Sequence, residues 1–297
     1  MGARYVALRG RLDMVAAELS GLPRAEVQRA IAAGRVRVDG RSRPKSFSLL
    51  GGEVLELDLA GMVELPAEGP AVELAYRDPD LVVVSKPPGL PTHPTANRRS
   101  GTLVNRLLGM GVPLADTGDP LRPGIVHRLD AGTSGLMVVA CSEAAAPLLV
   151  AMFRRHEVGR RYLALVRGVV EHERFAVEAP LGRRGARIRV QATGARPAET
   201  RFDVLERFPR VTLLEATPRT GRTHQIRVHL SSVGHPILGD RRYGGGGQDA
   251  ERLGLSRPFL HSHRLAFEHP LSGRRIRTQD PLPEDLERAL RRVRGEG

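Results

Sequence analysis

The feature that most constrains this chain is an unbroken apolar run at residues 136–140, which directly follows the turn-forming segment 132–135. A short run of this kind, bounded by a turn, is typical of a strand buried on both faces. Asp130 lies between this run and the strand-like pair Ile125 and Val126, so we expect its carboxylate at a sheet edge or in a cleft. Two interpretations of Asp130 remain open: an acid displayed for chemistry, or a turn residue whose carboxylate bonds backbone amides.

The length and charge of the chain limit the classes of protein to which it can belong. With 297 residues, of which 41% are hydrophobic, it can form a real core in one large domain or in two domains. Its 46 Lys and Arg residues outnumber its 33 Asp and Glu residues, which gives a formal net charge of +13. Such an excess favours a polyanionic partner, nucleic acid before membrane.

Cysteine content and hydropathy indicate where the chain works. Cys141 is the single cysteine and follows an apolar run, which predicts a core residue and excludes a disulfide within the chain. No run reaches the length of about 18 apolar residues that a membrane span needs, and the N-terminus lacks the apolar stretch of a secretory signal. We therefore expect a soluble, cytoplasmic protein in a reducing environment.

Residues 12–59 predict a small unit in which two helices precede a small sheet. Apolar residues recur at helical spacing from Leu12 to Leu19, where a Ser-Gly pair ends the pattern. A second helix is predicted to begin at Pro23, a favoured first-turn residue, and to end at Gly34.

The sheet of this unit is predicted from alternation. Two valines alternate with Arg35 and Arg37, and Asp39 and Gly40 supply a hairpin-type turn. Leucines then alternate with acidic residues over residues 55–59. The unit resembles the S4 RNA-binding module, whose recurring segments correspond here to RLDMVAAEL, QRAIAAGRVRVDG and GGEVLEL. The alternative is a small basic domain whose arginines are only solvated.

A change of pattern separates this unit from the rest of the chain. Residues 60–75 contain prolines and glycines without sustained periodicity, which predicts a linker. An apolar strand over residues 81–84 leads into a loop at 85–94, where prolines enforce an extended course. Lys86 in this loop either contacts a phosphate or is merely exposed. A helical stripe follows over residues 103–108.

The middle of the chain adds an aromatic residue and a basic hairpin. Residues 144–156 have the composition of a helix, and residues 160–166 pass from basic to strand-like with Tyr162 at the junction. The structural alternative for Tyr162 is an aromatic at the edge of a sheet. Residues 180–201 contain six arginines among turn residues and predict a hairpin with a basic tip, either an RNA grip or a solvated loop.

A second informative segment, TPRTGRTHQIRVHLSSVGHPILGD, begins at Thr217. Ile226 and Leu230 lie four residues apart on one face of a predicted helix. Arg227 lies beside that face, from which its guanidinium can reach a carboxylate elsewhere. The glycine patterns of a P-loop and of a dinucleotide-binding turn are absent, so the sequence gives little support for a nucleotide cofactor.

The C-terminal part predicts packing elements. Residues 259–270 are expected to form a pair of strands. In residues 282–297, Leu286, Leu290 and Val293 recur at helical spacing, which predicts a helix that packs on the core.

Ten histidines raise the question of a metal site, but their spacing does not support one. The pairs His261 with His263 and His224 with His229 lack further ligands at the spacing of a known site, and one cysteine excludes cysteine-rich zinc sites. HExxH is absent, and so is the nucleophile elbow of a serine hydrolase. We therefore expect no catalytic metal, and hydrolysis loses support.

Five segments in the same order resemble the signature segments of the RluA/RluD-type pseudouridine synthases. They are HRLDAGTSG at 127–135, RYLALVRG at 161–168, TGRTHQIRVHL at 220–230, GHPILGDRRYG at 234–244 and LHSHRLAFEHP at 260–270. The likeness covers about residues 76–280, and the S4-like unit stands in front, as in many members. One departure is KPPGLPTHP, where many relatives have a KPAG-like form.

The resemblance implies an RNA uridine isomerase with three catalytic residues. Asp130 would be the essential carboxylate, Tyr162 the aromatic that contacts the target base, and Arg227 the partner of Asp130. A uridine in paired RNA must be flipped out and stacked on an aromatic side chain. An ionised carboxylate in a dry pocket can then act as a nucleophile, and an adjacent guanidinium favours that ionised form. No redox cofactor, nucleotide or metal is required, and whether Asp130 attacks the ribose or the base first stays open.

Further residues are expected to bind RNA through their charge or position. Arg128, beside the acid, either fills the space left by the flipped base or holds a phosphate. The other expected RNA contacts are His127, Lys86, Arg222, Arg35 and Arg37.

The predicted chain is of the α+β class. An S4-like α/β domain at 12–59 and a linker at 60–75 precede a pseudouridine synthase domain at 76–281, built on a mixed, mostly antiparallel sheet with flanking helices. A C-terminal helix and tail follow at 282–297. The expected partner is structured RNA, above all large-subunit ribosomal RNA in the ribosomal subunit or its precursor, and the expected state is a monomer. The alternative is a non-catalytic RNA-binding or ribosome-assembly factor that retains the fold.

Overall fold

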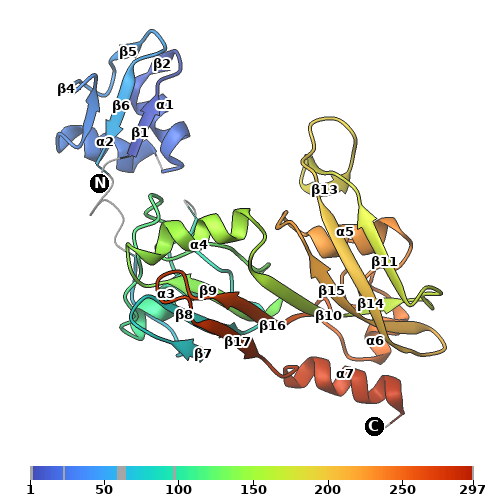
Figure 1. Cartoon of the computed structure of the whole chain (residues 1–297). Coiled ribbons are helices and arrows are strands. Elements are labelled where there is room, and N and C mark those ends of the chain that lie inside the picture. The colour runs from blue at the N-terminus through green and yellow to red at the C-terminus, as the bar shows by residue number, and fades with distance from the viewer. Residues whose placement is uncertain (1–2, 23, 59–64, 96–97, 296–297) are drawn as a thin grey trace. The chain divides into compact units, whose positions relative to one another are not determined.

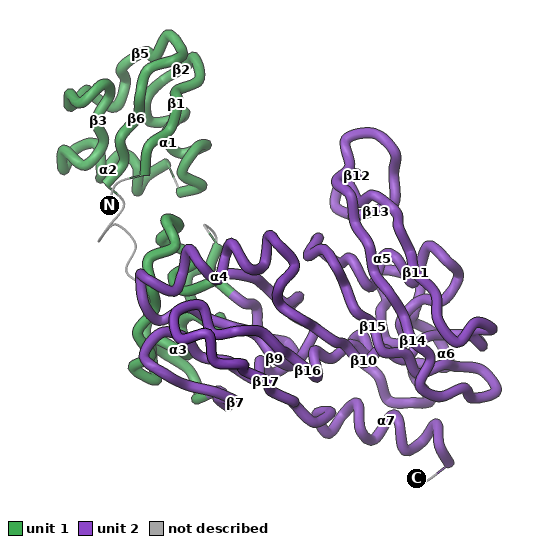
Figure 2. Tube along the Cα trace, in the orientation of Figure 1, with its two compact units in different colours: residues 1–71, 93–125 green, residues 72–92, 126–297 purple. Residues whose placement is uncertain are grey.

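The computed structural model describes residues 3–22, 24–58, 65–95 and 98–295, which form two compact units (Figure 2). Unit 1 consists of residues 1–71 and 93–125, and unit 2 consists of residues 72–92 and 126–297. Each unit therefore combines two separate parts of the sequence. In the described part of the chain, no helix has the length and apolar character needed to cross a membrane.

The first part of unit 1 has two helices and a four-stranded antiparallel sheet of order β1-β6-β3-β4, while β2 pairs with β5. Its elements are β1 (Ala3–Val6), β2 (Gly10–Arg11), α1 (Leu12–Ser20), α2 (Arg24–Ala32), β3 (Val36–Val38), β4 (Arg41–Ser42), β5 (Ser48–Leu49) and β6 (Val54–Leu57). The predicted order of helix, helix and sheet is confirmed, with β1 and β2 as additional strands in front. Pro23 and Leu59, to which part of this prediction referred, lie outside the described residues.

Two turns in unit 1 follow from residues that tolerate a left-handed backbone. Gly21 caps α1 at φ 68°, and its N–H donates to the carbonyl of Ala17. Asp39 and Gly40 have φ values of 49° and 74° and join β3 to β4. Positive φ at both central residues is the signature of the two-residue hairpin turn that matches strand twist, so the predicted hairpin is confirmed.

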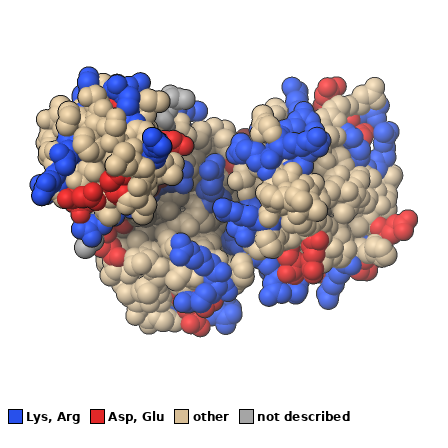
Figure 3. All heavy atoms as spheres, turned by 90° about the horizontal axis from the view of Figure 1, so that it is seen from above, with Lys and Arg blue, Asp and Glu red and all other residues tan. Residues whose placement is uncertain are grey.

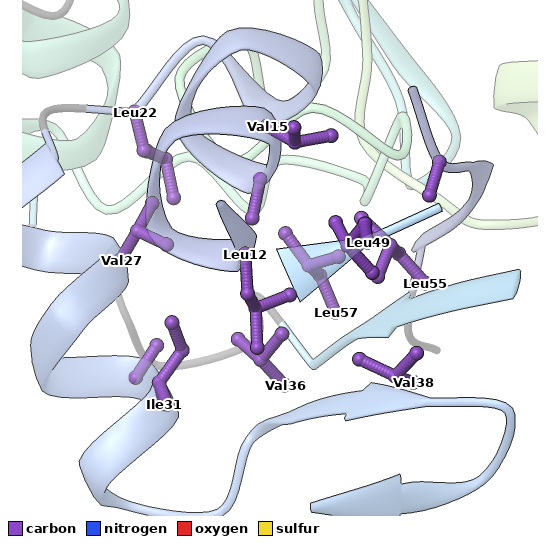
Figure 4. Close-up of a cluster of buried hydrophobic side chains, with 13 residues drawn as sticks. Leu12, Val15, Leu22, Val27, Ile31, Val36, Val38, Leu49, Leu55 and Leu57 are labelled. Carbon is purple, nitrogen blue, oxygen red and sulfur yellow. The ribbon is translucent and has the colours of Figure 1, made fainter. Parts of the chain in front are cut away.

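Thirteen buried apolar residues form the core of this part of unit 1, and most are labelled in Figure 4. Leu12 and Val15 of α1 meet Val27 of α2, and Leu55 and Leu57 of β6 line the same core. The helices bury their apolar stripes against one face of the sheet because neither element can bury that surface alone.

The region expected to be a linker is partly structured. Residues 60–64 lie outside the described residues. Glu68 donates its backbone N–H to the carbonyl of Asn105 in α3 (Leu103–Gly109), and the Asn105 amide donates to the carbonyl of Pro66. Strand β7 (Glu73–Arg77) also begins before residue 76. The linker prediction is therefore wrong for residues 73–75, because this stretch is paired in a sheet.

Unit 2 is built on a nine-stranded sheet of order β11-β14-β15-β10-β16-β9-β8-β7, with β17 paired to β16 (Figure 1). Every pairing is antiparallel except that of β16 with β9, so the predicted mixed, mostly antiparallel sheet is confirmed. The strands beyond β7 are β8 (Leu81–Lys86), β9 (Ser134–Ala140), β10 (Gly159–Arg167), β11 (Arg174–Glu178), β14 (Glu199–Arg207), β15 (Val211–Pro218), β16 (Leu260–Glu268) and β17 (Arg275–Gln279).

Helices and a hairpin flank this sheet. Helix α4 (Ala145–Arg154) contacts β9, and α5 (Gln225–Ser232) contacts β14, β15 and the hairpin of β12 (Leu181–Arg184) and β13 (Arg187–Val190). The two remaining helices are α6 (Gln248–Arg252) and α7 (Glu284–Arg294), and α7 buries Leu286 and Leu290 as predicted. The hairpin predicted in residues 180–201 is also confirmed.

Two expected strands differ from the structure. Ile125 forms only an isolated bridge and Val126 lies in a bend, so this pair is no strand. Residues 259–270 contain the single strand β16, and its hairpin partner is β17. Local alternation indicates extended backbone in such segments, but it does not show which strand will be the partner.

The parallel pairing of β9 with β16 depends on Gly135. This glycine has a φ of 110°, and a Cβ atom built on it would lie 2.3 Å from the carbonyl oxygen of Ser262 in β16. No larger residue fits there, so the turn that carries Asp130 runs directly against β16. The run that follows in β9 is completely buried, as predicted. Cys141 after it is also buried, and burial raises the pKa of its thiol to about 11.

Candidate active site

A cavity of about 460 Å³ opens in unit 2 beside the turn that precedes β9. Its walls come from residues 126–133, the C-terminal end of α4, strand β10, the turn after β15 and the start of α5. Asp130, Tyr162 and Arg227 all line it, together with His127, Arg128, Arg160, Arg222 and His224. The fold thus brings together side chains from segments that lie far apart in the sequence.

Asp130 presents its carboxylate to this cavity. The turn itself is closed by backbone, because the N–H of Thr133 donates to the carbonyl of Asp130. One carboxylate oxygen, Oδ2, accepts a hydrogen bond from Arg227 Nη1 at 2.9 Å, and the other, Oδ1, lies 3.8 Å from His224 Nε2. The side chain is 18% exposed. The carboxylate is therefore ion-paired and reachable from the cavity.

Arg227 lies in α5 and bridges two carboxylates. Its Nε and Nη2 donate to Asp240 at 2.6 and 3.0 Å, while its Nη1 donates to Asp130. The Tyr243 ring lies under the guanidinium at 5.0 Å from its centroid. Burial lowers the pKa of Arg227, but the hydrogen bonds and charges of Asp240 and then Asp130 outweigh burial and raise it. Arg227 therefore stays charged.

Tyr162 is buried in the middle of the sheet. Strand β10 is paired on both sides, with Tyr162 opposite Ala216 of β15 and Ser262 of β16. The interpretation of Tyr162 as an aromatic at a sheet edge is therefore wrong. Burial raises the pKa of its phenol, so the hydroxyl carries its proton at neutral pH. An aromatic ring in the cavity wall can stack on a planar base.

His127 does not supply a positive charge at neutral pH. Its ring stacks on Phe153 at 4.2 Å between centroids, and its Nε2 accepts a hydrogen bond from the N–H of Val138. Burial, and next the charge of Arg160, lowers the pKa of His127 to about 3. His127 is therefore a neutral residue in the cavity wall, because protonation would cost the bond to Val138, and its contact with RNA stays a prediction.

His127→Gln is expected to reduce the loss in free energy of unfolding that occurs as the pH falls. The unfolded chain takes up a proton on His127 near pH 6.5, whereas the folded chain does so only near pH 3. The unfolded state binds more protons in this window, so stability present above pH 6.5 is lost as the pH falls towards 3, by up to about 1.4 kcal/mol per pH unit. Urea unfolding at pH 7 and pH 4.5 measures the loss. His172→Gln, at an exposed histidine, is the control and should keep the wild-type difference; equal pH dependence in all three proteins would contradict the prediction.

Lys86 is fully buried and does not reach RNA. Its ammonium donates to the carbonyls of Pro87, Leu90 and Ala131 at 2.9, 2.9 and 3.2 Å. Both sequence-based interpretations, phosphate contact and exposure, are therefore wrong. Ala131 directly follows Asp130, so the strand end at Lys86 supports the turn that displays the acid.

Lys86→Met is expected to lower the free energy of unfolding by about 3 kcal/mol or more, because buried carbonyls lose their donor. Methionine keeps most of the volume, so the loss reports hydrogen bonding rather than a cavity. Urea unfolding measures the change. Lys45→Met, at an exposed lysine, should be neutral within about 0.5 kcal/mol. A stable Lys86→Met protein whose RNA binding alone has weakened would restore the original RNA-contact interpretation.

The remaining expected RNA contacts lie at surfaces. Arg128 is exposed and lines the cavity. Arg222 also lines it and donates from Nε to the carbonyl of Pro197. Arg35 and Arg37 are exposed in unit 1, at and beside β3, while the alternating valines face the core.

Sequence reasoning missed three residues at the site. Asp240 and Tyr243 lie in the segment GHPILGDRRYG, which was used for resemblance without a role for either residue. His224 caps α5 with a left-handed φ of 56°. Its contact with Asp130 had no sequence signal beyond its position three residues before Arg227.

The histidine pairs considered for metal binding have protein partners. His261 and His263 are bonded to Ser134 and Glu215, and His229 is bonded to Thr200. In residues that the structure describes, one group with metal-ligand atoms within 4.8 Å of one another was found: Asp78, Asp80 and His269. In it His269 Nε2 lies 3.0 Å from Asp78 Oδ2, away from the residues that line the cavity.

Comparison with known proteins identifies the family. Residues 80–232 match the family model described as RNA pseudouridylate synthase, and residues 10–55 match the S4 domain. The chain is 39% identical to an RNA pseudouridine synthase of Mycobacterium tuberculosis, over 97% of this chain and 95% of that relative. It is 39% identical to ribosomal large subunit pseudouridine synthase D of Pseudomonas aeruginosa, over 93% and 89%. The solved structure of human RNA pseudouridylate synthase domain containing 4 matches with a TM-score of 0.60 and 26% identity, over 74% of this chain and 92% of that one. The chain therefore belongs to the RNA pseudouridylate synthase family and carries an S4 domain in its N-terminal part.

Proposed function

We propose that this enzyme converts uridines of large-subunit ribosomal RNA to pseudouridine, with Asp130 as the nucleophile. The observation that carries the proposal is the ion pair of Asp130 with Arg227 in a cavity that Tyr162 also lines. A carboxylate that is paired with a guanidinium and reachable from a cavity is suited to attack on an electrophilic carbon.

In the proposed reaction, the target nucleotide is flipped out of the RNA into the cavity, and its uracil stacks against Tyr162. The bond from uracil N1 to ribose C1′ breaks, the uracil turns, and a bond from C5 to C1′ forms. The hydrogen on C5 leaves as a proton and N1 gains one, so atoms and electrons balance without an external oxidant or reductant. Asp130 forms a transient bond to the ribose or to the base, and this bond breaks again before the product leaves, so that the free carboxylate is regenerated. Arg227 donates a hydrogen bond to that carboxylate.

The proposed RNA grip uses exposed arginines. The hairpin of β12 and β13 carries Arg183, Arg184, Arg187 and Arg189, and basic side chains gather on the face shown in Figure 3. Arg128 and Arg222 would hold RNA at the cavity, and Arg35 and Arg37 would do so on the S4 domain. Phosphate contacts of this kind supply affinity and position, while the cavity supplies the chemistry.

Large-subunit ribosomal RNA is proposed because relatives that align along most of the chain carry that substrate in their names. The test compares pseudouridine maps of ribosomal RNA from cells with and without the protein. We expect one or more large-subunit uridines to lose the modification, and restoration by the wild-type chain but not by Asp130→Asn. Unchanged ribosomal maps with a lost transfer RNA site would overturn this substrate. Restoration by Asp130→Asn would favour a ribosome-assembly factor.

Arg35→Gln combined with Arg37→Gln is expected to weaken RNA binding without changing the reaction step. For each arginine that binds a phosphate, its removal lowers the slope of log K against log salt concentration by roughly 0.7 to 0.9. Binding titrations between 50 and 200 mM salt, about the range in which such slopes are read, provide the measurement. Glu56→Gln, on the neighbouring strand, is the matched control and should not lower the slope. An unchanged slope in the double variant would exclude both arginines as phosphate contacts.

A further inference from the structure

The segment around Asp240 packs on the start of α5 and contacts both groups that face Asp130. Asp240 accepts two hydrogen bonds from Arg227, and the hydroxyl of Tyr243 lies 2.7 Å from His224 Nδ1. His224 is the residue before α5 and Arg227 is the third residue of α5, so both belong to the start of this helix. The short segment around Asp240 thus contacts both of the groups that face Asp130, Arg227 and His224.

Hydrogen bonds and close packing hold the segment around Asp240 in place. Asp240 is 1% exposed, and its Oδ1 also accepts hydrogen bonds from the backbone N–H groups of Arg242 and Tyr243 at 3.2 and 3.3 Å. Ser231 near the end of α5 donates its hydroxyl to the carbonyl of Tyr243 at 2.8 Å. A Cβ on Gly245 would lie 1.6 Å from the carbonyl oxygen of Ile237, so the segment is tightly folded on itself.

Tyr243 sets the direction of the His224 ring. The N–H of Ile188 points to the Tyr243 oxygen at 3.4 Å, so the hydroxyl is free to donate its hydrogen to His224 Nδ1. In the tautomer whose Nδ1 accepts this bond, the ring proton of neutral His224 lies on Nε2, the atom 3.8 Å from Asp130 Oδ1. Burial lowers the pKa of His224, which favours this neutral form. The left-handed backbone of His224 costs energy that its surroundings must offset.

We propose that Asp240 and Tyr243 are positioning residues that hold Arg227 and His224 against the two carboxylate oxygens of Asp130. The proposal rests on the proposed role of Asp130 as nucleophile. Arg227 alone fixes one oxygen and leaves the carboxylate plane free to rotate about that contact. The His224 ring flanks the other oxygen, with Nε2 at 3.8 Å, and so limits that rotation by its position rather than by a hydrogen bond. Geometric precision of this kind is worth large factors in rate.

Asp240 also competes with Asp130 for the positive charge of Arg227. The charged or titratable groups around Asp130 are Arg227 of α5, His224 before it, Tyr162 and Arg160 of β10, Arg128 near Asp130, Arg222 and Arg242 on neighbouring loops, and Asp240 behind Arg227. Asp240 is the acid that offsets the guanidinium in this set. If Asp240 lost its charge, Arg227 would interact more strongly with ionised Asp130, but the position of its guanidinium would be less well fixed.

Asp240→Asn tests whether Asp240 offsets part of the charge that Arg227 presents to Asp130. We expect kcat on an unmodified transcript of large-subunit ribosomal RNA to fall about a hundredfold, with KM little changed. The acid limb of the pH–rate profile should move to lower pH, because the guanidinium of Arg227 would then have one carboxylate partner instead of two. Loss of Arg227 would move that limb to higher pH, so the two variants separate by sign. Asp240→Glu restores the charge and should return the limb towards its wild-type position. An acid limb unchanged in Asp240→Asn would overturn the role of Asp240.

Tyr243→Phe tests the contact between the Tyr243 hydroxyl and His224, and it keeps the aromatic ring under Arg227. Loss of one neutral hydrogen bond should lower kcat roughly fivefold without shifting KM, and Tyr76→Phe, outside the cavity, should match wild type. Wild-type kcat in Tyr243→Phe would overturn the role of Tyr243, and this variant decides the proposal if Asp240→Asn does not fold. A wild-type protein that makes no pseudouridine in the transcript would instead contradict the proposed substrate.

Discussion

Asp130→Asn is expected to abolish pseudouridine formation, with a rate lowered on the order of 10⁴- to 10⁶-fold, as is usual when a nucleophile or its partner is removed. An amide is nearly the same size as a carboxylate and still accepts a hydrogen bond from Arg227, but it carries no charge and is a poor nucleophile. The measurement incubates the variant with an unmodified large-subunit ribosomal RNA transcript and maps pseudouridine.

Two comparisons make this result specific. Asp203→Asn removes a half-exposed acid on β14 that pairs with Arg174, and it should leave the rate unchanged. RNA binding by Asp130→Asn should remain close to wild type, because phosphate contacts by arginines do not involve this acid. Product at the wild-type rate from Asp130→Asn would end the proposal of a nucleophilic carboxylate.

Arg227→Ala is expected to affect both activity and stability. It leaves Asp240 as a buried carboxylate without its guanidinium, and breaking a buried ion pair in this way costs about 3–5 kcal/mol. Activity should fall at least about a hundredfold. The acid limb of the pH–rate profile should move to higher pH, because nothing then favours ionised Asp130 as strongly. Urea unfolding and a pH–rate profile give the two measurements.

Arg227→Lys separates charge from geometry. Lysine keeps the positive charge but lacks the planar fork that binds Asp240 through two nitrogens. It should keep more of the stability than alanine does, while activity remains low because the ammonium cannot satisfy both carboxylates at their present distances. An Arg227→Ala protein with wild-type stability and an unchanged pH profile would contradict the pairing seen in the structure.

Much of the local structure could be predicted because it is encoded in short patterns. The buried strand β9, the helices α1 and α7, and the hairpin turn at Asp39 and Gly40 follow from periodicity and turn chemistry over a few residues, and α4 follows from composition. Where the sequence misled, as for residues 259–270, extended backbone was present, but the pairing partner lay outside the pattern. Strand pairing depends on residues distant in sequence, so alternation cannot identify it.

In the candidate site, too, some features could be predicted from the sequence and others depend on the tertiary structure. The sequence by itself determined the family, through five segments in the same order, and singled out Asp130, Tyr162 and Arg227 as candidates. Only the tertiary structure placed Arg227 Nη1 on Asp130 across 97 residues of sequence, and only it showed Asp240 behind the guanidinium.

Burial was likewise decided by the tertiary structure. Lys86 and His127 carry side chains that can be charged, and the sequence predicts an RNA contact for each of them. The fold instead surrounds the Lys86 ammonium with carbonyls and keeps the His127 ring neutral against Phe153. A residue type states which charge a group can carry. Whether that charge faces RNA, a backbone carbonyl or no partner at all depends on packing among segments far apart in the chain.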